Sequence, residues 1–295
     1  MTTNAEKIGI LAAVLSSLFG GMAAAVTRFA VAVADPVLLA ICRFGGGFLV
    51  LLPIALLARA RWPKGKDWLA VAALGAMFYG VFFVVYGEAL VYTTAARGAL
   101  AVSTLPVLTM VIAALLGREQ LSPRKTGGVL VAMAGVAAAL ATGLSDAPKD
   151  AWRGDVTMLA GMLSMALYNV LSRPLMARSS PLGYATAGMA FGALLNVVFA
   201  WTSGGLPALD ELRFAHWIAV AYLGIFAGGL GFYLWVYALR VTTPTRVANT
   251  ITVSPIAAAT LATVLVGERI GIPLVLGIVA VAAGIWISST AGASE

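Results

Sequence analysis

Two stretches of the chain, 149 residues apart, decide the fold: WLAVAALGAMFYGVFFVVYGEALVYTTAAR at residues 68–97 and WIAVAYLGIFAGGLGFYLWVYALRVTTPTR at residues 217–246. Identical residues recur in one register, among them Trp68 and Trp217, Gly75 and Gly224, Phe83 and Phe232, and Arg97 and Arg246. Chance matching of alanine-rich apolar sequence would give scattered Ala and Leu matches instead. The pattern therefore predicts an internal repeat.

The repeat extends over most of the chain. The offset of 149 continues through Pro106 with Pro255, Glu119 with Glu268, Gly128 with Gly277, and Gly135 with Gly284. An offset of 145 aligns the first helices, pairing Gly9 with Gly154, Arg28 with Arg173, and Pro36 with Pro181. We therefore expect two related units, residues 1–146 and residues 150–295.

Composition places both units in a membrane. Of the 295 residues, 61% are hydrophobic and 11% are charged, whereas a soluble domain carries about 25% charged residues. A helix needs about 20 apolar residues to cross the hydrocarbon core. Continuous apolar runs indicate helices, because barrel strands alternate apolar and polar residues. The sequence predicts an all-α integral membrane protein with ten transmembrane helices, at residues 8–27, 37–58, 68–91, 95–116, 125–144, 154–173, 182–203, 216–236, 245–266 and 272–289.

The positive charges predict the orientation. Lys and Arg lie in short clusters between the apolar runs and favour a cytoplasmic position for both termini. We expect a multi-pass protein of the bacterial inner membrane, and the net charge of +7 does not indicate nucleic-acid binding. The first apolar run is longer than the ~7–15 residues of a signal-peptide core, so it is predicted to be a retained span.

The number of helices in each unit determines how the two units are oriented in the membrane. Each unit is predicted to have five helices, an odd number, so the second unit must enter the membrane in the opposite orientation to the first. Two inverted repeats can open a central site alternately to either side, as in many secondary transporters.

A recurring motif resembles a known family. Ala-Leu-x-x-Thr-Thr-x-x-Arg-x-Ala begins at Ala89 and again at Ala238, followed by Pro106 or Pro255, an acidic residue after glycine, and a Gly-rich last helix. This resembles the EamA-type transporters of the drug/metabolite transporter (DMT) superfamily, in particular bacterial amino-acid exporters, including the aromatic amino-acid branch. The resemblance implies export of small metabolites, most of all amino acids, through a basket-shaped ten-helix bundle with a central cavity.

One charge stands inside a predicted span. Arg43 lies about seven residues into its helix, ~10 Å below the outer edge at 1.5 Å per residue, and an intramembrane charge usually has a partner or faces a cavity. We expect an Arg43–Glu88 pair at similar depth, with Glu88 a candidate proton acceptor. The alternative is that Glu88 reaches the interface and Arg43 meets only carbonyl groups.

Aromatic and amide side chains are candidates for a substrate cavity. Such residues would stack on a flat apolar solute and bind its polar end, although any one of them could instead serve packing. The predicted cavity residues are Tyr79, Phe83, Tyr86, Tyr168, Asn169, Phe232, Trp235, Asn249 and Thr252.

Proline and glycine recur at equivalent positions of both units. Pro106 and Pro255 are predicted to lie in mid-helix and to act as hinges or breaks, although prolines are common in membrane helices. Small residues spaced by seven lie on one helix face and allow close helix packing, which we expect of Gly128, Gly135, Gly277 and Gly284.

The sequence shows no motif that is typical of an enzyme active site. The single histidine, His216, belongs to no cluster with metal-ligand spacing, and no phosphate-binding loop motif is present. We expect no metal and no cofactor. The expected partners are a small-molecule substrate, an amino acid or similar metabolite, and membrane lipid, and it stays open whether the protein is monomeric. The alternatives are a multidrug or other metabolite exporter of the same fold, a membrane-embedded lipid-modifying enzyme, or a channel or flippase.

Overall fold

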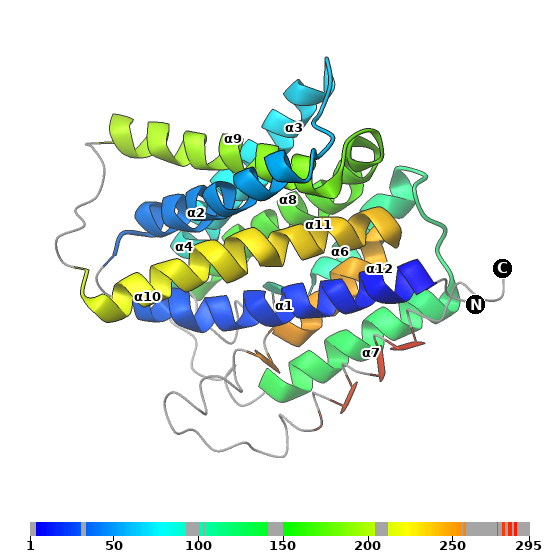
Figure 1. The fold of residues 1–295 in the computed structure, drawn as a ribbon. Coiled ribbons are helices and arrows are strands. Elements are labelled where there is room, and N and C mark those ends of the chain that lie inside the picture. The colour runs from blue at the N-terminus through cyan, green and yellow to red at the C-terminus, as the bar shows by residue number, and fades with distance from the viewer. Residues whose placement is uncertain are drawn as a thin grey trace.

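The computed structural model describes most of the chain. The described residues are 4–30, 34–92, 101–102, 104–140, 150–203, 212–254, 256–257, 276, 279–280, 283–284 and 286–287. Within them the regular structure is helical throughout (Figure 1). The elements are α1 (Asn4–Ala30), α2 (Pro36–Leu57), α3 (Asp67–Gly75), η1 (Ala76–Phe82), α4 (Phe83–Tyr92), α6 (Leu105–Leu115), α7 (Pro123–Leu140), α8 (Ala151–Arg178), α9 (Pro181–Thr202), α10 (Phe214–Tyr222), η3 (Leu223–Leu230), α11 (Gly231–Val241), α12 (Pro244–Asn249) and η4 (Thr250–Thr252).

Many of these helices are long and apolar enough to cross a bilayer. The described residues contain six such segments: Asn4–Ala23, Pro36–Leu57, Asp67–Tyr86, Trp152–Arg178, Pro181–Thr202 and Phe214–Val241. Large apolar side chains on them face outward, including Leu49, Leu57, Leu69 and Leu194, as expected of a surface in contact with lipid. Each of the six corresponds to a predicted span, so the chain is an all-helical, multi-pass membrane protein.

The remaining predicted spans are described less fully. The predicted helix at 95–116 is represented by α6, and that at 125–144 by α7. The predicted helix at 245–266 begins with α12 and η4, but most of it, like most of the helix predicted at 272–289, lies outside the described residues. The count of ten therefore stays a prediction.

The second helix of each predicted unit begins in the same way. Asp35 caps α2 by accepting hydrogen bonds from the backbone N–H groups of Val37 and Leu38, at 2.7 and 3.4 Å. Ser180 caps α9 by accepting from the N–H of Gly183 at 3.1 Å. A proline follows each cap, where its missing donor costs nothing and its fixed φ suits a helix start.

Two π-helical segments interrupt long spans at related places. Segment η1 lies between α3 and α4, and η3 lies between α10 and α11. The offset of 149 found in the sequence places residues 76–82 on residues 225–231, which overlap η3. A π-helical turn disrupts the regular hydrogen-bond ladder of a helix and is frequent at functional sites.

Glycines let each π-helical segment pack closely on a neighbouring helix. A Cβ atom at Gly192 in α9 would lie 2.8 Å from the backbone carbonyl carbon of Tyr79 in η1, and one at Gly47 in α2 would lie 2.9 Å from the backbone nitrogen of Gly229 in η3. Backbones approach this closely only where side chains are absent. Thus η1 contacts α9 and η3 contacts α2, while α2 and α9 lie side by side (Figure 1).

Polar contacts join helix ends that are distant in the sequence. The guanidinium group of Arg178 at the end of α8 binds Asp67 at the start of α3 with two hydrogen bonds of 2.8 Å. Arg61 donates to the carbonyl oxygen of Ser179 at 3.1 Å. On another pair of elements, Arg246 of α12 forms an ion pair with Glu6 of α1.

We predict that Arg178→Gln leaves stability nearly unchanged. The side chain of Arg178 is 56% exposed, and solvent screening makes exposed ion pairs weak. The melting temperature of the purified protein in detergent should match that of the wild type within error. A clear loss of melting temperature would show that the Asp67–Arg178 contact holds α3 and α8 together.

Candidate functional site

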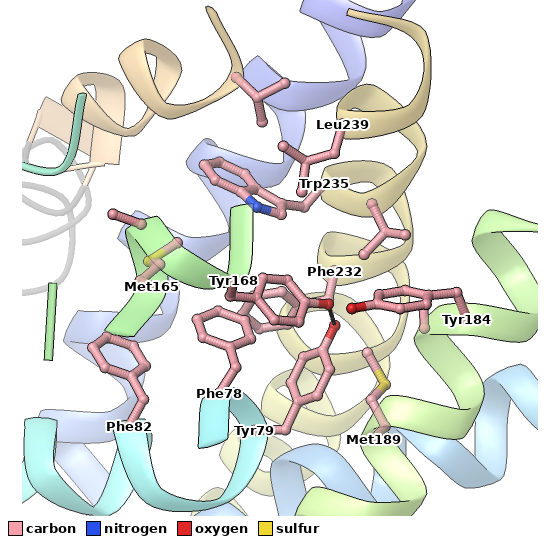
Figure 2. Close-up of a cluster of buried hydrophobic side chains, with 14 of the residues drawn as sticks. Phe78, Tyr79, Phe82, Met165, Tyr168, Tyr184, Met189, Phe232, Trp235 and Leu239 are labelled. Carbon is pink, nitrogen blue, oxygen red and sulfur yellow. Dashed lines mark hydrogen bonds between the residues drawn. The ribbon is translucent and has the colours of Figure 1, made fainter. Parts of the chain in front are cut away.

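Several helical segments contribute aromatic rings to one buried cluster (Figure 2). It combines residues from both predicted units. The ring centroids of Phe78 and Tyr168 are 4.3 Å apart, those of Phe44 and Phe83 are 4.7 Å apart, and Phe232 lies within 6 Å of Phe44 and Phe78. The segments that supply these rings are α2, η1, α4, α8 and α11. This cluster, called the aromatic core below, thus contains rings from both predicted units.

Hydroxyl groups interrupt this apolar cluster. The hydroxyls of Tyr79 and Tyr168 are hydrogen-bonded at 2.7 Å, and those of Ser172 and Tyr184 at 2.5 Å. The rings of Tyr168 and Tyr184 lie 6.2 Å apart, and Figure 2 shows Tyr184 beside the bond between Tyr79 and Tyr168. All four side chains are buried. They form a polar strip across a region that is otherwise hydrocarbon.

Two buried asparagines make further polar contacts with residues of this cluster. Trp235 donates its indole N–H to Oδ1 of Asn169 at 2.9 Å, and Asn169 is fully buried. Within the described residues, Nδ2 of Asn169 has no hydrogen-bond partner. Asn196 of α9 donates to the backbone carbonyl of Tyr79 at 3.3 Å. A carbonyl in a π-helical segment can lack its usual partner, so the Asn196 amide supplies one.

We predict that Tyr168→Phe destabilises the protein by about 1 kcal/mol, because it removes one hydrogen bond and leaves the buried Tyr79 hydroxyl without its partner. The measurement is the melting temperature in detergent. Tyr92→Phe is the matched control, since the Tyr92 side chain is exposed. Equal melting temperatures for both variants would contradict a structural role for the hydroxyl pair.

Arg43 projects into the same aromatic cluster. The central carbon of its guanidinium group lies 4.6 Å from the ring centroid of Phe83 and 5.6 Å from those of Phe44 and Phe232. Its Nε atom is buried and, among the described residues, without a hydrogen-bond partner. A cation over aromatic faces gains some stabilisation, but the rings supply no counter-charge.

The structure does not bring Arg43 and Glu88 together. Glu88 is exposed on α4, and no ion pair between these two residues is found in the described part of the chain. The reason is helical geometry: Phe83 faces Arg43, and a residue five positions later points about 140° away around the helix. The expected pair is therefore not formed in this structure.

Most of the other predicted cavity residues do meet. Tyr79, Tyr168, Asn169, Phe232 and Trp235 are buried together, and half-buried Phe83 and Tyr86 pack against them. Asn249 and Thr252 are buried in α12 and η4. Asn249 donates to the carbonyl of Gly284 at 3.4 Å, and Thr252 donates to the carbonyl of Asn249 at 2.7 Å. These two bonds stabilise α12 and η4.

The prolines and glycines have distinct positions. Pro106 is buried at the second residue of α6, and residues 101–102 before α6 are helical as well, so Pro106 lies next to an interruption of the predicted span. At this place proline costs no hydrogen bond, because the first N–H groups of a helix lack helical partners. A Cβ at Gly284 would lie 2.6 Å from the carbonyl oxygen of Gly128, so these glycines are in close contact. Gly135 is buried on α7, whereas Pro255 and Gly277 lie outside the described residues.

Several residues of the cluster were not predicted. Phe78 and Phe82 flank Tyr79 in η1, Phe44 follows Arg43, and Tyr184 and Asn196 come from α9. The amide of Asn196 inside an apolar span was a usable signal, since such a group needs a partner. Among the described residues, no group of three or more His, Cys, Asp or Glu could hold a metal ion.

Known proteins resemble this chain over most of its length. The model of the EamA-like transporter family matches residues 7–141 and again residues 152–290. An "Uncharacterized transporter YyaM" of Bacillus subtilis is 24% identical, over 92% of this chain and 90% of that protein. A "Probable terminal-alkyne amino-acid exporter" of Streptantibioticus cattleyicolor is 28% identical, over 67% of this chain and 65% of that protein.

A solved crystal structure shares the fold. It superposes with a TM-score of 0.82 at 22% identity, over 99% of this chain and 100% of the other. At this identity the likeness concerns the fold alone. Together with the two family matches, it leads to one assignment: the chain belongs to the EamA-like transporter family, within the DMT superfamily.

Proposed function

We propose that this protein is a secondary transporter that exports small metabolites, amino acids first among them, across the bacterial inner membrane. The observation that carries the proposal is the polar strip inside the aromatic core. Tyr79, Tyr168 and Asn169 place polar atoms at the centre of a membrane-embedded bundle. Polar side chains within a membrane domain are costly and usually mark a solute or ion pathway.

The proposed mechanism is alternating access between two inverted five-helix halves. Its support is the crosswise packing of η1 on α9 and of η3 on α2. In Figure 1, α2 begins and α9 ends on the same side of the bundle, so these equivalent helices run in opposite directions. The two successive family matches agree with this arrangement. Two such halves can exchange roles when the transporter changes state.

In the proposed cycle, this structure with its packed aromatic core is a closed state of the transporter. Its rings are in mutual contact and its hydroxyls are paired with one another. A solute that enters from the cytoplasm would separate these rings and take over part of their hydrogen bonds. Contacts that join the two halves at other levels, such as Glu6 with Arg246, would break in one state and form in the other.

Amino acids are proposed as the solutes for two reasons. Aromatic rings beside hydroxyl and amide groups suit a solute with an apolar side chain and a polar end. A relative carries the name of an amino-acid exporter. A multidrug exporter of cations is less well supported, because Arg43 would repel a positive charge in the core.

A transport assay on the purified chain tests the proposal. Proteoliposomes would be screened for uptake of the twenty amino acids and several cationic drugs, with and without a pH gradient. We expect saturable uptake of a small set of amino acids with apolar side chains. Uptake of cationic drugs alone would replace the proposed substrate, and no uptake of any solute would contradict the proposal as a whole.

The proposed topology has its own test. Both termini are expected in the cytoplasm, so a reporter that is active only outside the inner membrane should be inactive at either terminus. Activity at one terminus only would mean an odd number of spans. That result would remove the inverted five-helix arrangement.

A further inference from the structure

We infer that Arg43 is the binding group for one carboxylate of the transported solute, and that this protein therefore selects small apolar monocarboxylates, amino acids included. The inference rests on the proposed function, since it names the solute class that the same core accepts. Its starting point is the charge of Arg43, which lies among the rings of Phe44, Phe83 and Phe232.

Arg43 is half-buried with a buried Nε atom, whereas two cations of the described residues that are buried more deeply each have a carboxylate of their own. Arg246, whose side chain is 7% exposed, pairs with Glu6, and Lys125, 9% exposed, pairs with Glu119. Among the described residues no ion pair is found for Arg43, and its Nε atom lacks a hydrogen-bond partner. Burying a charge without a counter-charge is unfavourable, so the site is complementary to an anion from outside the chain.

The geometry of arginine favours a carboxylate. Its planar guanidinium group offers donors in a fork that matches the two oxygen atoms of a carboxylate group. The rings beside it are apolar, and such a bond is stronger in apolar surroundings than in water. A solute whose carboxylate reached Arg43 would also place its apolar part against the same rings.

The charge of the site favours a single negative group. Arg43 is the one cation found over the rings of Phe44, Phe83 and Phe232 in the described part of the chain. One guanidinium group neutralises one carboxylate, whereas a phosphate or a dicarboxylate would bring a second negative charge with no partner.

Arg43 lies at a contact between the two proposed halves. Its backbone carbonyl packs against Gly228 of η3, so closely that a Cβ there would collide with it. The rings that face it come from α2, α4 and α11. A carboxylate that drew the guanidinium group out of these rings would loosen contacts made by both halves at once.

The test compares solutes that differ only in the carboxylate. Full-length protein in liposomes would be given phenylalanine, 3-phenylpropionate, phenylalanine amide and phenethylamine, and the same panel would be repeated for each amino acid that the screen identifies. We expect the wild type to prefer the two acids over the amide and the amine by about 10- to 100-fold in kcat/KM, since a hydrogen bond to a charged group is worth this much.

Substitutions test whether Arg43 causes the preference for acids over the amide and the amine. Arg43→Gln should lower kcat/KM for the two acids by the same factor of about 10- to 100-fold, so that acid and amide are transported alike. Arg43→Lys should keep part of the preference for acids. Arg153→Gln is the matched control, because Arg153 also lies over a ring, that of Trp152, but its side chain is 59% exposed. It should transport like the wild type.

A binding measurement covers the case in which a variant transports poorly for other reasons. At saturating concentration, 3-phenylpropionate should raise the melting temperature of the wild type and of Arg153→Gln, but not that of Arg43→Gln. Equal transport of acid, amide and amine by the wild type would overturn the carboxylate site and leave the transporter standing. An unchanged acid preference in Arg43→Gln would overturn the role of Arg43, and no transport of any solute would refute the proposed function itself.

Discussion

Gly228→Ala should lower the stability of the folded protein by about 3 kcal/mol, at the upper end of the usual cost of overpacking. A methyl group at this position would collide with the carbonyl oxygen of Arg43, and backbone cannot move aside as a flexible side chain can. The substitution would push α2 away from η3, and with it the guanidinium group of Arg43. We expect a large drop in melting temperature in detergent, together with loss of transport.

Gly127→Ala is the matched control for this prediction. Gly127 lies on α7, and a Cβ added there would meet no heavy atom within 4 Å. Alanine favours the helical state over glycine by roughly 0.5–1 kcal/mol, so this variant should be as stable as the wild type or slightly more stable. If both variants had the melting temperature of the wild type, this would contradict the close approach of α2 and η3.

Glu119→Gln should also destabilise the protein strongly, by about 3 kcal/mol, since it leaves a buried charge without its partner. The Glu119 side chain is 3% exposed and pairs with Lys125. It also accepts a hydrogen bond of 3.0 Å from the backbone N–H of Thr245 at the start of α12. Glutamine keeps an acceptor for that N–H but removes the negative charge that Lys125 needs.

A double substitution separates charge from shape at this site. Replacing Glu119 by Gln and Lys125 by Met removes both charges, and we expect it to recover much of the melting temperature lost in the single variant. Asp150→Asn is the control, because it breaks the exposed Arg153–Asp150 pair at 3.9 Å, and it should have no measurable effect. A single variant as stable as the wild type would show that the buried pair of Lys125 and Glu119 contributes little to stability.

The sequence was sufficient to predict the spans and much of the core. Apolar runs and helix starts such as Pro36 and Pro181 depend on local composition, and the six described spans lie where they were predicted. Tyr79, Tyr168, Asn169 and Trp235 were predicted to line a substrate cavity, because aromatic and amide groups suit a solute with a polar end, and this role stays a prediction. Their partners proved to be one another.

Other features depend on geometry that periodicity does not encode. Tyr79 alone was predicted from the segment that forms η1, but this π-helical segment also places Phe78 and Phe82 in the cluster. The expected pair of Arg43 with Glu88 rested on equal depth in the membrane, and depth says nothing of the direction around the helix axis. Pro106 was expected in mid-helix, because an apolar run conceals the break before Leu105.

The central claim is that this chain carries a solute through the aromatic core by alternating access, and counterflow tests it most directly. Proteoliposomes loaded with a high concentration of an unlabelled amino acid found in the uptake screen would be diluted into a trace of the same labelled amino acid. The account predicts transient accumulation of label above its external concentration, because a carrier exchanges solute faster than it returns empty. Uptake that rises linearly with concentration and shows no accumulation from preloading would mean an open pore, and would contradict the account.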